Sequence, residues 1–130
     1  MRNFKIIFAS LVLISILSSC NSGLSERIGG NFDEDKWKAD SWGCNNQRIQ
    51  MLEAIQLADE NVKLLADADI RQLFGRPDKI ELSSRSQKFY LYYLEQGQQC
   101  QDEEAISGAG RALEVSLDAL GRLHEINIRL

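Results

Sequence analysis

The sequence has little of the chemistry that many enzymes and nucleic-acid-binding proteins need. It contains a single histidine, His124, so a metal site built on imidazoles would have no second histidine ligand. Fifteen basic residues stand against 19 acidic ones, and the chain lacks the basic excess that favours binding to nucleic acid. We therefore expect no metal, no cofactor, no nucleic-acid partner and no enzymatic activity.

Two groups of polar residues could carry chemistry, and neither has the sequence context that the chemistry needs. Ser83 or Ser84 could join Asp118 and His124 in a catalytic triad. Neither serine lies in a strand–turn–helix nucleophile motif, so we reject the triad. The acidic run at residues 102–104 could bind calcium, but it lacks the alternating ligands and the glycine of a calcium loop. We interpret this run as a solvated face.

The N-terminal segment has the order of a secretory signal. Arg2 and Lys5 precede the apolar stretch at residues 6–17, and two small serines follow it. The stretch is shorter than the roughly 20 residues that cross a bilayer core. Its ending, L-S-S-C, resembles the lipobox of bacterial lipoproteins. This resemblance implies a signal peptide at residues 1–19 and a lipid on Cys20; an ordinary cleavage site before an unmodified cysteine is the alternative.

Residues 20–130 are long enough for one domain with a hydrophobic core and too short for two. Removal of residues 1–19 takes away two basic residues and no acidic one, so the formal net charge moves from −4 to −6. Cys44 and Cys100 are then an even pair in an oxidising compartment, which favours a disulfide between them. Two separate buried thiols are the alternative.

Residues 20–44 are predicted to form a lipid-anchored tether. Up to residue 36 they are polar, contain glycine and show no hydrophobic periodicity. Trp37 and Trp42 follow, and large aromatic residues at a domain edge usually pack on its core. We expect the two tryptophans to do so; docking on a partner is the alternative.

Residues 45–130 are predicted to form an α+β domain. Apolar residues recur along one face of a helix, at Met51, Ile55, Ala58, Val62 and Leu65. A short second helix, capped by Asp67 or Asp69, should end at Gly75 because Pro77 forbids its continuation. Strands are then predicted at residues 79–82, 89–94, 112–117 and 123–130, the last two joined by a hairpin. Alternation of apolar and polar residues gives the sheet one dry face, on which the helices should pack.

The strand at residues 89–94 is apolar or aromatic on both faces, so one set of side chains must point away from the helices. One arrangement places Phe89, Leu91 and Tyr93 in the core. Tyr90 and Tyr92 then stand on the wet face, where tyrosine suits a protein-binding surface. The alternative is that a tryptophan or the tether covers Tyr90 and Tyr92.

The run IRQLFGRPD at residues 70–78, with the tyrosine-rich strand and the closing hairpin, resembles the SmpA/OmlA (BamE-like) lipoprotein domain. The leucine, glycine, proline and aspartate of that family's motif correspond to Leu73, Gly75, Pro77 and Asp78. The resemblance covers residues 45–130. It implies two N-terminal helices packed on one face of a three-stranded antiparallel sheet.

The same resemblance implies an outer-membrane lipoprotein that faces the periplasm and binds other envelope proteins as a module or assembly adaptor. Asn21 and Ser22 follow Cys20 without an aspartate, which in lipoprotein sorting looks like outer-membrane delivery. The chain departs from the family in its long loop at residues 99–110 and in its cysteine pair. The layout also resembles small secreted inhibitors of the β-lactamase-inhibitor type, so enzyme inhibition or small-ligand binding is the alternative function.

Overall fold

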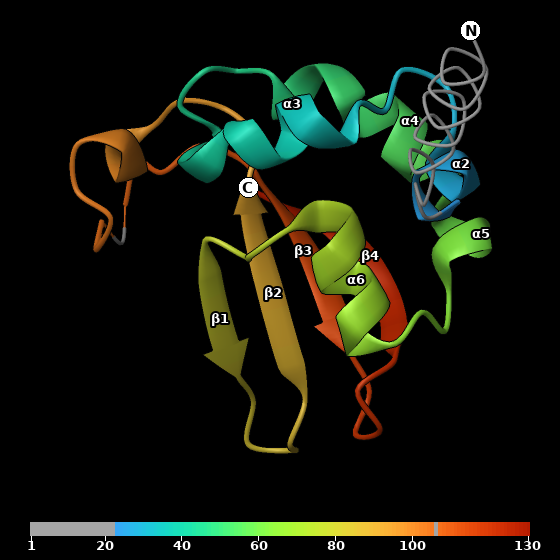
Figure 1. Ribbon diagram of the computed structural model, residues 1–130. Coiled ribbons are helices and arrows are strands. Elements are labelled where there is room, and N and C mark those ends of the chain that lie inside the picture. Colours follow the sequence, from blue (N-terminus) through green and yellow to red (C-terminus); the bar gives the residue numbers. More distant parts are fainter. Residues whose placement is uncertain (1–22, 106) are drawn as a thin grey trace, which may run out of the picture.

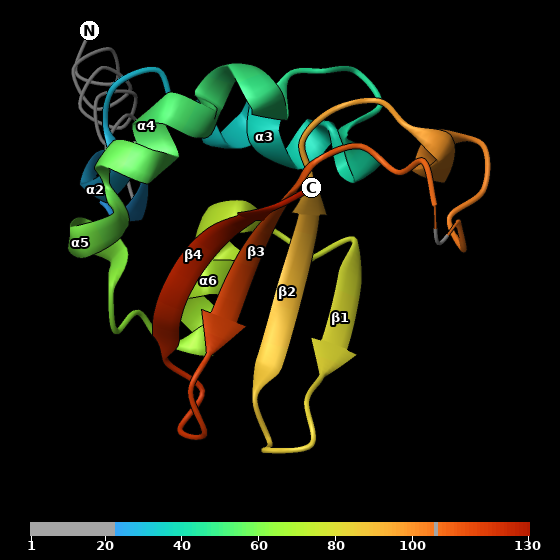
Figure 2. The same cartoon turned by 180° about the vertical axis from the view of Figure 1, so that it is seen from behind.

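The computed structural model describes residues 23–105 and 107–130. Cys20 and the expected signal peptide lie outside the described residues. The described chain is α+β: α6 (Asp67–Phe74) lies across one face of a four-stranded antiparallel sheet with strand order β1-β2-β3-β4, and α2, α3 and α4 lie beyond the end of the sheet at which β2 finishes (Figure 1, Figure 2). Within these two ranges, no helix is long and apolar enough to cross a membrane.

The helices and strands follow one another in a simple order along the chain. The α-helices are α2 (Leu24–Ile28), α3 (Glu34–Ala39), α4 (Leu52–Leu57), α5 (Asp59–Val62) and α6 (Asp67–Phe74). Single 3-10 turns are η1 (Ser41–Gly43), η2 (Arg48–Met51) and η3 (Gln98–Cys100). The strands are β1 (Lys79–Leu82), β2 (Lys88–Tyr93), β3 (Ala112–Leu117) and β4 (Leu123–Arg129). Each strand begins and ends within one residue of its predicted bounds.

The sheet has four strands and not the three that the family resemblance implies. The additional strand lies at the β1 edge, where Lys79 is opposite Leu91 and Leu82 is opposite Lys88. The pattern of the residues themselves indicated four strands, because it also marked residues 79–82. The dry face is formed as predicted: Leu113, Val115 and Leu117 of β3 are buried in the core.

The apolar stripe between Met51 and Leu65 is buried as predicted, but it lies on η2, α4 and α5 rather than on one continuous helix. The helical run ends at Leu64, whose backbone has a φ of 64°. There the chain turns to the sheet: the Leu64 N–H donates to the Leu123 carbonyl oxygen, and the Leu123 N–H donates to that of Leu65. Pairing with β4 therefore replaces the next helical turn.

α6 ends as the sequence predicts and begins differently. Gly75 has a φ of 76°, and its N–H donates to the Arg71 carbonyl oxygen, which closes the helix. At the other end, the residue that caps the helix is Ala66, which has no side-chain acceptor. Asp67 and Asp69 lie in the first turn instead, where their negative charges interact favourably with the positive end of the helix dipole.

Residues 24–44 belong to the domain and not to a tether, which corrects the predicted boundary. Trp37 of α3 is fully buried, and its Nε1–H donates to the Phe74 carbonyl oxygen at 3.1 Å. Its ring lies 5.4 Å from that of Phe74 and 6.0 Å from that of Tyr92. No hydrophobic periodicity marks this segment because α2 and α3 have 5 and 6 residues and bury a single residue each, Ile28 and Trp37.

Candidate functional site

Tyr90 and Tyr92 lie in the core beneath the helices, so they are not the exposed tyrosines of a binding surface. Both side chains have no exposed area. In the sheet Tyr90 is opposite Val115 and Tyr92 is opposite Leu113, and both of these β3 residues belong to the core. The predicted orientation of β2, with Tyr90 and Tyr92 on the face away from the helices, is therefore wrong. The side chains of Tyr90 and Tyr92 point to the helix-covered face.

The hydroxyl groups of these two buried tyrosines are used within the fold. The Tyr92 hydroxyl donates to the Gly75 carbonyl oxygen at 3.0 Å, and the Tyr90 hydroxyl donates to Asp67 at 2.6 Å. Burial raises the pKa of both tyrosines. Partial burial works to raise the pKa of Asp67 as well, but hydrogen bonds from Tyr90 and Arg71 outweigh it and lower that pKa. These groups hold α6 on the sheet and form no open site.

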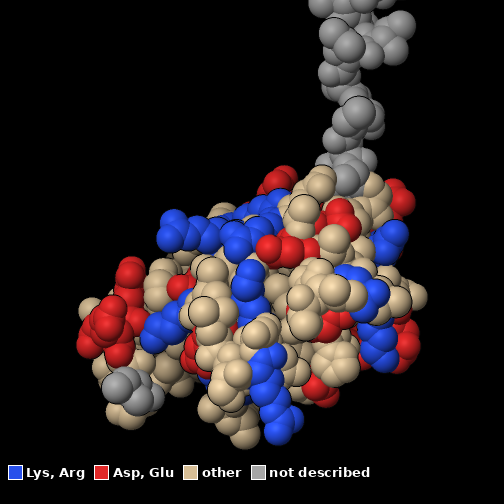
Figure 3. All heavy atoms as spheres, turned by 90° about the horizontal axis from the view of Figure 1, so that it is seen from below, with Lys and Arg blue, Asp and Glu red and all other residues tan. Residues whose placement is uncertain are grey.

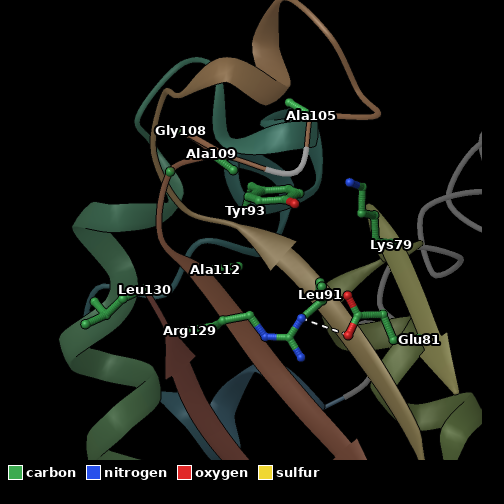
Figure 4. A pocket seen from close by; sticks show the side chains of 11 residues that line it. Lys79, Glu81, Leu91, Tyr93, Ala105, Gly108, Ala109, Ala112, Arg129 and Leu130 are labelled. Carbon is green, nitrogen blue, oxygen red and sulfur yellow. Dashed lines mark hydrogen bonds and ion pairs between the residues drawn. The ribbon is translucent and has the colours of Figure 1, made fainter. Parts of the chain in front are cut away.

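The opposite face of the sheet carries a hollow of about 360 Å³ with Leu91 and Tyr93 of β2 in its floor (Figure 4). β1 contributes Lys79 and Glu81 to its lining, and β4 contributes Arg129. The loop that follows η3 covers the end of the hollow near Tyr93. This open-face hollow therefore combines an apolar floor with a charged rim.

The Tyr93 ring is held in place from several sides. It stacks on the Trp42 ring, with ring centroids 5.7 Å apart and an interplanar angle of 18°. The Trp42 N–H donates to Asp78, and so does the Tyr93 N–H, which fixes both backbones to one carboxylate. The Lys79 ammonium lies 5.9 Å from the centroid of the Tyr93 ring. Among the described residues Lys79 has no carboxylate partner.

Arg129 is engaged with two carboxylates across the open face. It donates to Glu81 at 2.8 Å, the contact drawn in Figure 4, and also to Glu114. Partial burial lowers the pKa of Arg129, but the hydrogen bonds to Glu81 and Glu114 outweigh burial and raise it. Because these three groups neutralise one another in part, Lys79 is the rim cation that has no carboxylate partner among the described residues.

The loop over the hollow is tied to the rest of the domain by a disulfide between Cys44 and Cys100, with Cα atoms 5.8 Å apart. This bond is consistent with the predicted pairing of the two cysteines. The buried Gln99 amide adds three hydrogen bonds: it donates to the Trp42 and Glu95 carbonyl oxygens and accepts from the Gly110 N–H. The wall of the hollow is therefore braced by a covalent bond and a buried amide.

Of the residues considered for a catalytic triad, Asp118 and His124 line one hollow, and neither Ser83 nor Ser84 is among the residues that line it. The Asp118 carboxylate accepts from the Arg122 side chain and from the backbone N–H groups of Leu120 and Arg122. His124 is exposed at the start of β4, and Asp102, Glu103 and Glu104 are exposed in the loop. In the part of the chain that the structure describes, no three His, Cys, Asp or Glu residues are placed to hold a metal ion.

The sequence missed the open-face hollow because its residues come from four separate segments. A usable signal was present in the next strand. β3 alternates clearly, and antiparallel pairing places Val115 and Leu113 beside Tyr90 and Tyr92. Applied to β2, that alternation would have assigned Leu91 and Tyr93 to the open face.

Comparison with protein-family models, with curated proteins and with solved structures found no significant match for this chain. The resemblance to the SmpA/OmlA (BamE-like) domain therefore rests on the sequence motif alone, and the sheet has one strand more than that resemblance implies.

Proposed function

We propose that this chain is a lipid-anchored protein of the outer membrane, facing the periplasm, whose domain binds another envelope protein through the open-face hollow. One observation carries the binding proposal: the Tyr93 ring is fixed by stacking on Trp42, beside a lysine, Lys79, that has no carboxylate partner among the described residues. An aromatic floor with a polar rim is the composition that protein interfaces favour.

The construction of the hollow also favours binding. A ring that is already stacked and a loop that is already cross-linked lose little conformational entropy when a partner docks. Counted over the described residues of a single copy, the rim offers one cation without a carboxylate partner, Lys79, and one compensated group of charges around Arg129. We therefore expect the partner to insert an apolar side chain over Tyr93.

A small ligand is the alternative occupant, and the size of the hollow is the reason to consider it. Its volume of about 360 Å³ lies within the range of roughly 300 to 1,000 Å³ that is common for ligand sites. If this protein inhibits a soluble enzyme, we expect that enzyme to bind at the open-face hollow, as an envelope partner would. The binding experiment below therefore tests enzyme inhibition as well as envelope binding.

The binding proposal is tested by filling the hollow. Ala109 lines it from the loop, and Ala119 lies exposed in the turn between β3 and β4. The full chain would be purified from its own membranes as the unchanged protein, as Ala109→Trp and as Ala119→Trp, with mass spectrometry of the proteins that accompany it. We expect Ala109→Trp to lose a partner that Ala119→Trp keeps. Identical partners for both variants, with both folded by circular dichroism, would refute binding through the hollow.

The anchoring proposal has its own measurement. Mass spectrometry of the N-terminal peptide from the same preparation should find Cys20 as the first residue, carrying acyl chains. The variant Cys20→Ser should then leave the membrane fraction, because several acyl chains are needed for stable anchoring. If Cys20 is unmodified and the protein is absent from the membrane fraction, the anchoring proposal is refuted. That result would not affect the proposal that the open-face hollow binds a partner.

A further inference from the structure

β1 forms one edge of the sheet, and its outer side is open. The strand pairs with β2 alone, and in both views the described segment nearest its free side is the loop with η3, which lies beyond the end where β1 begins (Figure 1, Figure 2). Ile80 is 50% exposed and Leu82 is 76% exposed. The opposite edge is partly covered, because the backbone at Leu64 and Leu65 bonds to Leu123. A free edge with large apolar side chains is a template for a further strand.

We propose that β1 pairs with β1 of a second copy of this chain, antiparallel and in a register centred on Ile80. The two sheets then form one continuous sheet of eight strands. In this register Lys79 of each copy lies opposite Glu81 of the other, on the open face. Lys79 has no carboxylate partner within the described residues, and Glu81 contacts Arg129 through one oxygen. The pairing therefore gives each Lys79 a counter-charge that a single copy does not supply.

The same register covers the exposed apolar residue at its centre. Ile80 lies opposite Tyr90 within one copy, so its side chain is on the helix-covered face of the sheet. At the two-fold axis the two Ile80 side chains are direct neighbours, and each shields the other from water. β-Branched pairs of this kind stabilise neighbouring strands.

Charges at the two ends of β1 are complementary as well. Antiparallel pairing brings the end at which β1 begins in one copy beside the end at which it finishes in the other. The loop with Asp102, Glu103 and Glu104 projects past the free edge near the beginning of β1, and the turn with Arg85 follows its end (Figure 1). Figure 3 shows acidic side chains gathered at the side of the molecule on which this loop projects. Arg85 of each copy thus approaches the acidic run of the other.

Cysteine cross-linking of the full chain tests the register directly. In Ile80→Cys the two new thiols lie at the centre, where opposite Cα atoms are about 4.5 to 5.5 Å apart, within the span of a disulfide. In Leu82→Cys, residue 82 lies opposite residue 78 of the other copy, so the two thiols are separated by about 13 Å along the strand. After mild oxidation we expect a reducible dimer from Ile80→Cys and monomer from Leu82→Cys and the unchanged chain.

Each other pattern overturns the proposal. No cross-link in either variant would mean that the edge stays free, and equal cross-links would mean that contact is random. A product with the mass of a different protein would mean that another strand occupies the edge. None of these results would affect binding through the open-face hollow, which Ala109→Trp reports.

Charge reversal gives a second, independent measurement of the same contact. Sedimentation of the full chain in detergent should show that Lys79→Glu weakens dimer formation by about tenfold, because it opposes two acidic residues at each pair. The double variant Lys79→Glu with Glu81→Lys should restore dimer formation, since each pair is again of opposite sign. A monomer at all concentrations for the unchanged chain, or a double variant as weak as the single one, would refute the pairing.

Discussion

The Arg48 guanidinium lies 2.6 Å from the Asp78 carboxylate, and both side chains are almost fully buried. Arg48 also donates to the carbonyl oxygens of Trp37 and Tyr93. Asp78 in turn accepts from the backbone N–H groups of Trp42 and Tyr93. One ion pair thus joins α3, η1, η2, the segment before β1 and the end of β2, and it fixes the position of the Trp42–Tyr93 stack beside the hollow.

Removal of one member of this pair should be costly. In Asp78→Ala the buried Arg48 charge and two N–H groups lose their partner, and such losses cost about 3 to 5 kcal/mol of the free energy of unfolding. Urea denaturation followed by tryptophan fluorescence measures it. Asp102→Ala, in the exposed loop, is the matched control and should change stability by less than about 0.5 kcal/mol. A similar small effect for both variants would contradict the role given to Asp78.

The Cys44–Cys100 disulfide closes a loop over a sequence separation of 56 residues. In the chain-entropy model this closure contributes about 4 kcal/mol, less any strain. We expect the double variant Cys44→Ser with Cys100→Ser to lose up to that amount in urea denaturation. Added reductant should destabilise the unchanged protein to the same level and leave the double variant unaffected; an effect on the double variant would point to another cause.

Two glycines with similar backbone angles should respond very differently to alanine. Gly43 has a φ of 67°, and a Cβ there would lie 2.6 Å from the Tyr93 carbonyl oxygen. Gly121 has a φ of 73°, with no atom within 4 Å of such a Cβ. Gly121→Ala should cost about 1 to 2 kcal/mol for the left-handed backbone alone. Gly43→Ala should cost about 2 to 5 kcal/mol, because the clash adds to it; equal melting temperatures for the two variants would contradict this.

The two faces of β2 can be distinguished by removing one hydroxyl at a time. Tyr92→Phe removes the donor of the partly buried Gly75 carbonyl oxygen and should cost about 1 kcal/mol. The Tyr93 hydroxyl has no hydrogen-bond partner among the described residues, so Tyr93→Phe should lie within about 0.5 kcal/mol of the unchanged protein. Thermal denaturation of both variants gives the comparison. A larger loss for Tyr93→Phe would reverse the assignment of the faces.

Acid should weaken the brace between Glu95 and Arg111, which lie 2.8 Å apart near the start of the loop. The hydrogen bond from Arg111 lowers the pKa of Glu95. Because the pKa of Glu95 is lower in the folded protein than in the unfolded chain, its ionised form stabilises the fold. This stabilisation is fully present above the pKa of glutamate in the unfolded chain, about 4.3, and it is lost as the pH falls through the pKa of Glu95 in the folded protein. The urea midpoint should therefore fall more steeply below about pH 4.3 in the unchanged protein than in Glu95→Gln. Glu53→Gln, an exposed residue of α4, should keep the steep fall.

The sequence predicts those parts of the fold in which neighbouring residues carry the signal. Alternation in β3 and the left-handed residue Gly75 are local features, and both were recognised. The orientation of β2 is not local, because both of its faces are apolar. It is decided by Trp37, which packs over Tyr92, and by Trp42, which packs over Tyr93.

The candidate site is harder to predict than the fold for a related reason. Arg48 and Asp78 are charged residues 30 positions apart, and nothing near either residue marks it as buried. The hollow depends on the Cys44–Cys100 bond and on Gln99, which together hold a loop that composition alone describes as flexible. The pairing of the cysteines and the packing of Trp42 on the domain were available in advance.

If Cys20 carries a lipid, the packing of α2 into the domain limits how far the domain can stand from the membrane. Leu24, its first residue, is four positions after Cys20. Four residues span at most about 14 Å even when fully extended. A lipid on Cys20 would therefore keep the domain in a thin layer against the bilayer, where it diffuses in two dimensions. Partners held in the same membrane would meet it at a high local concentration.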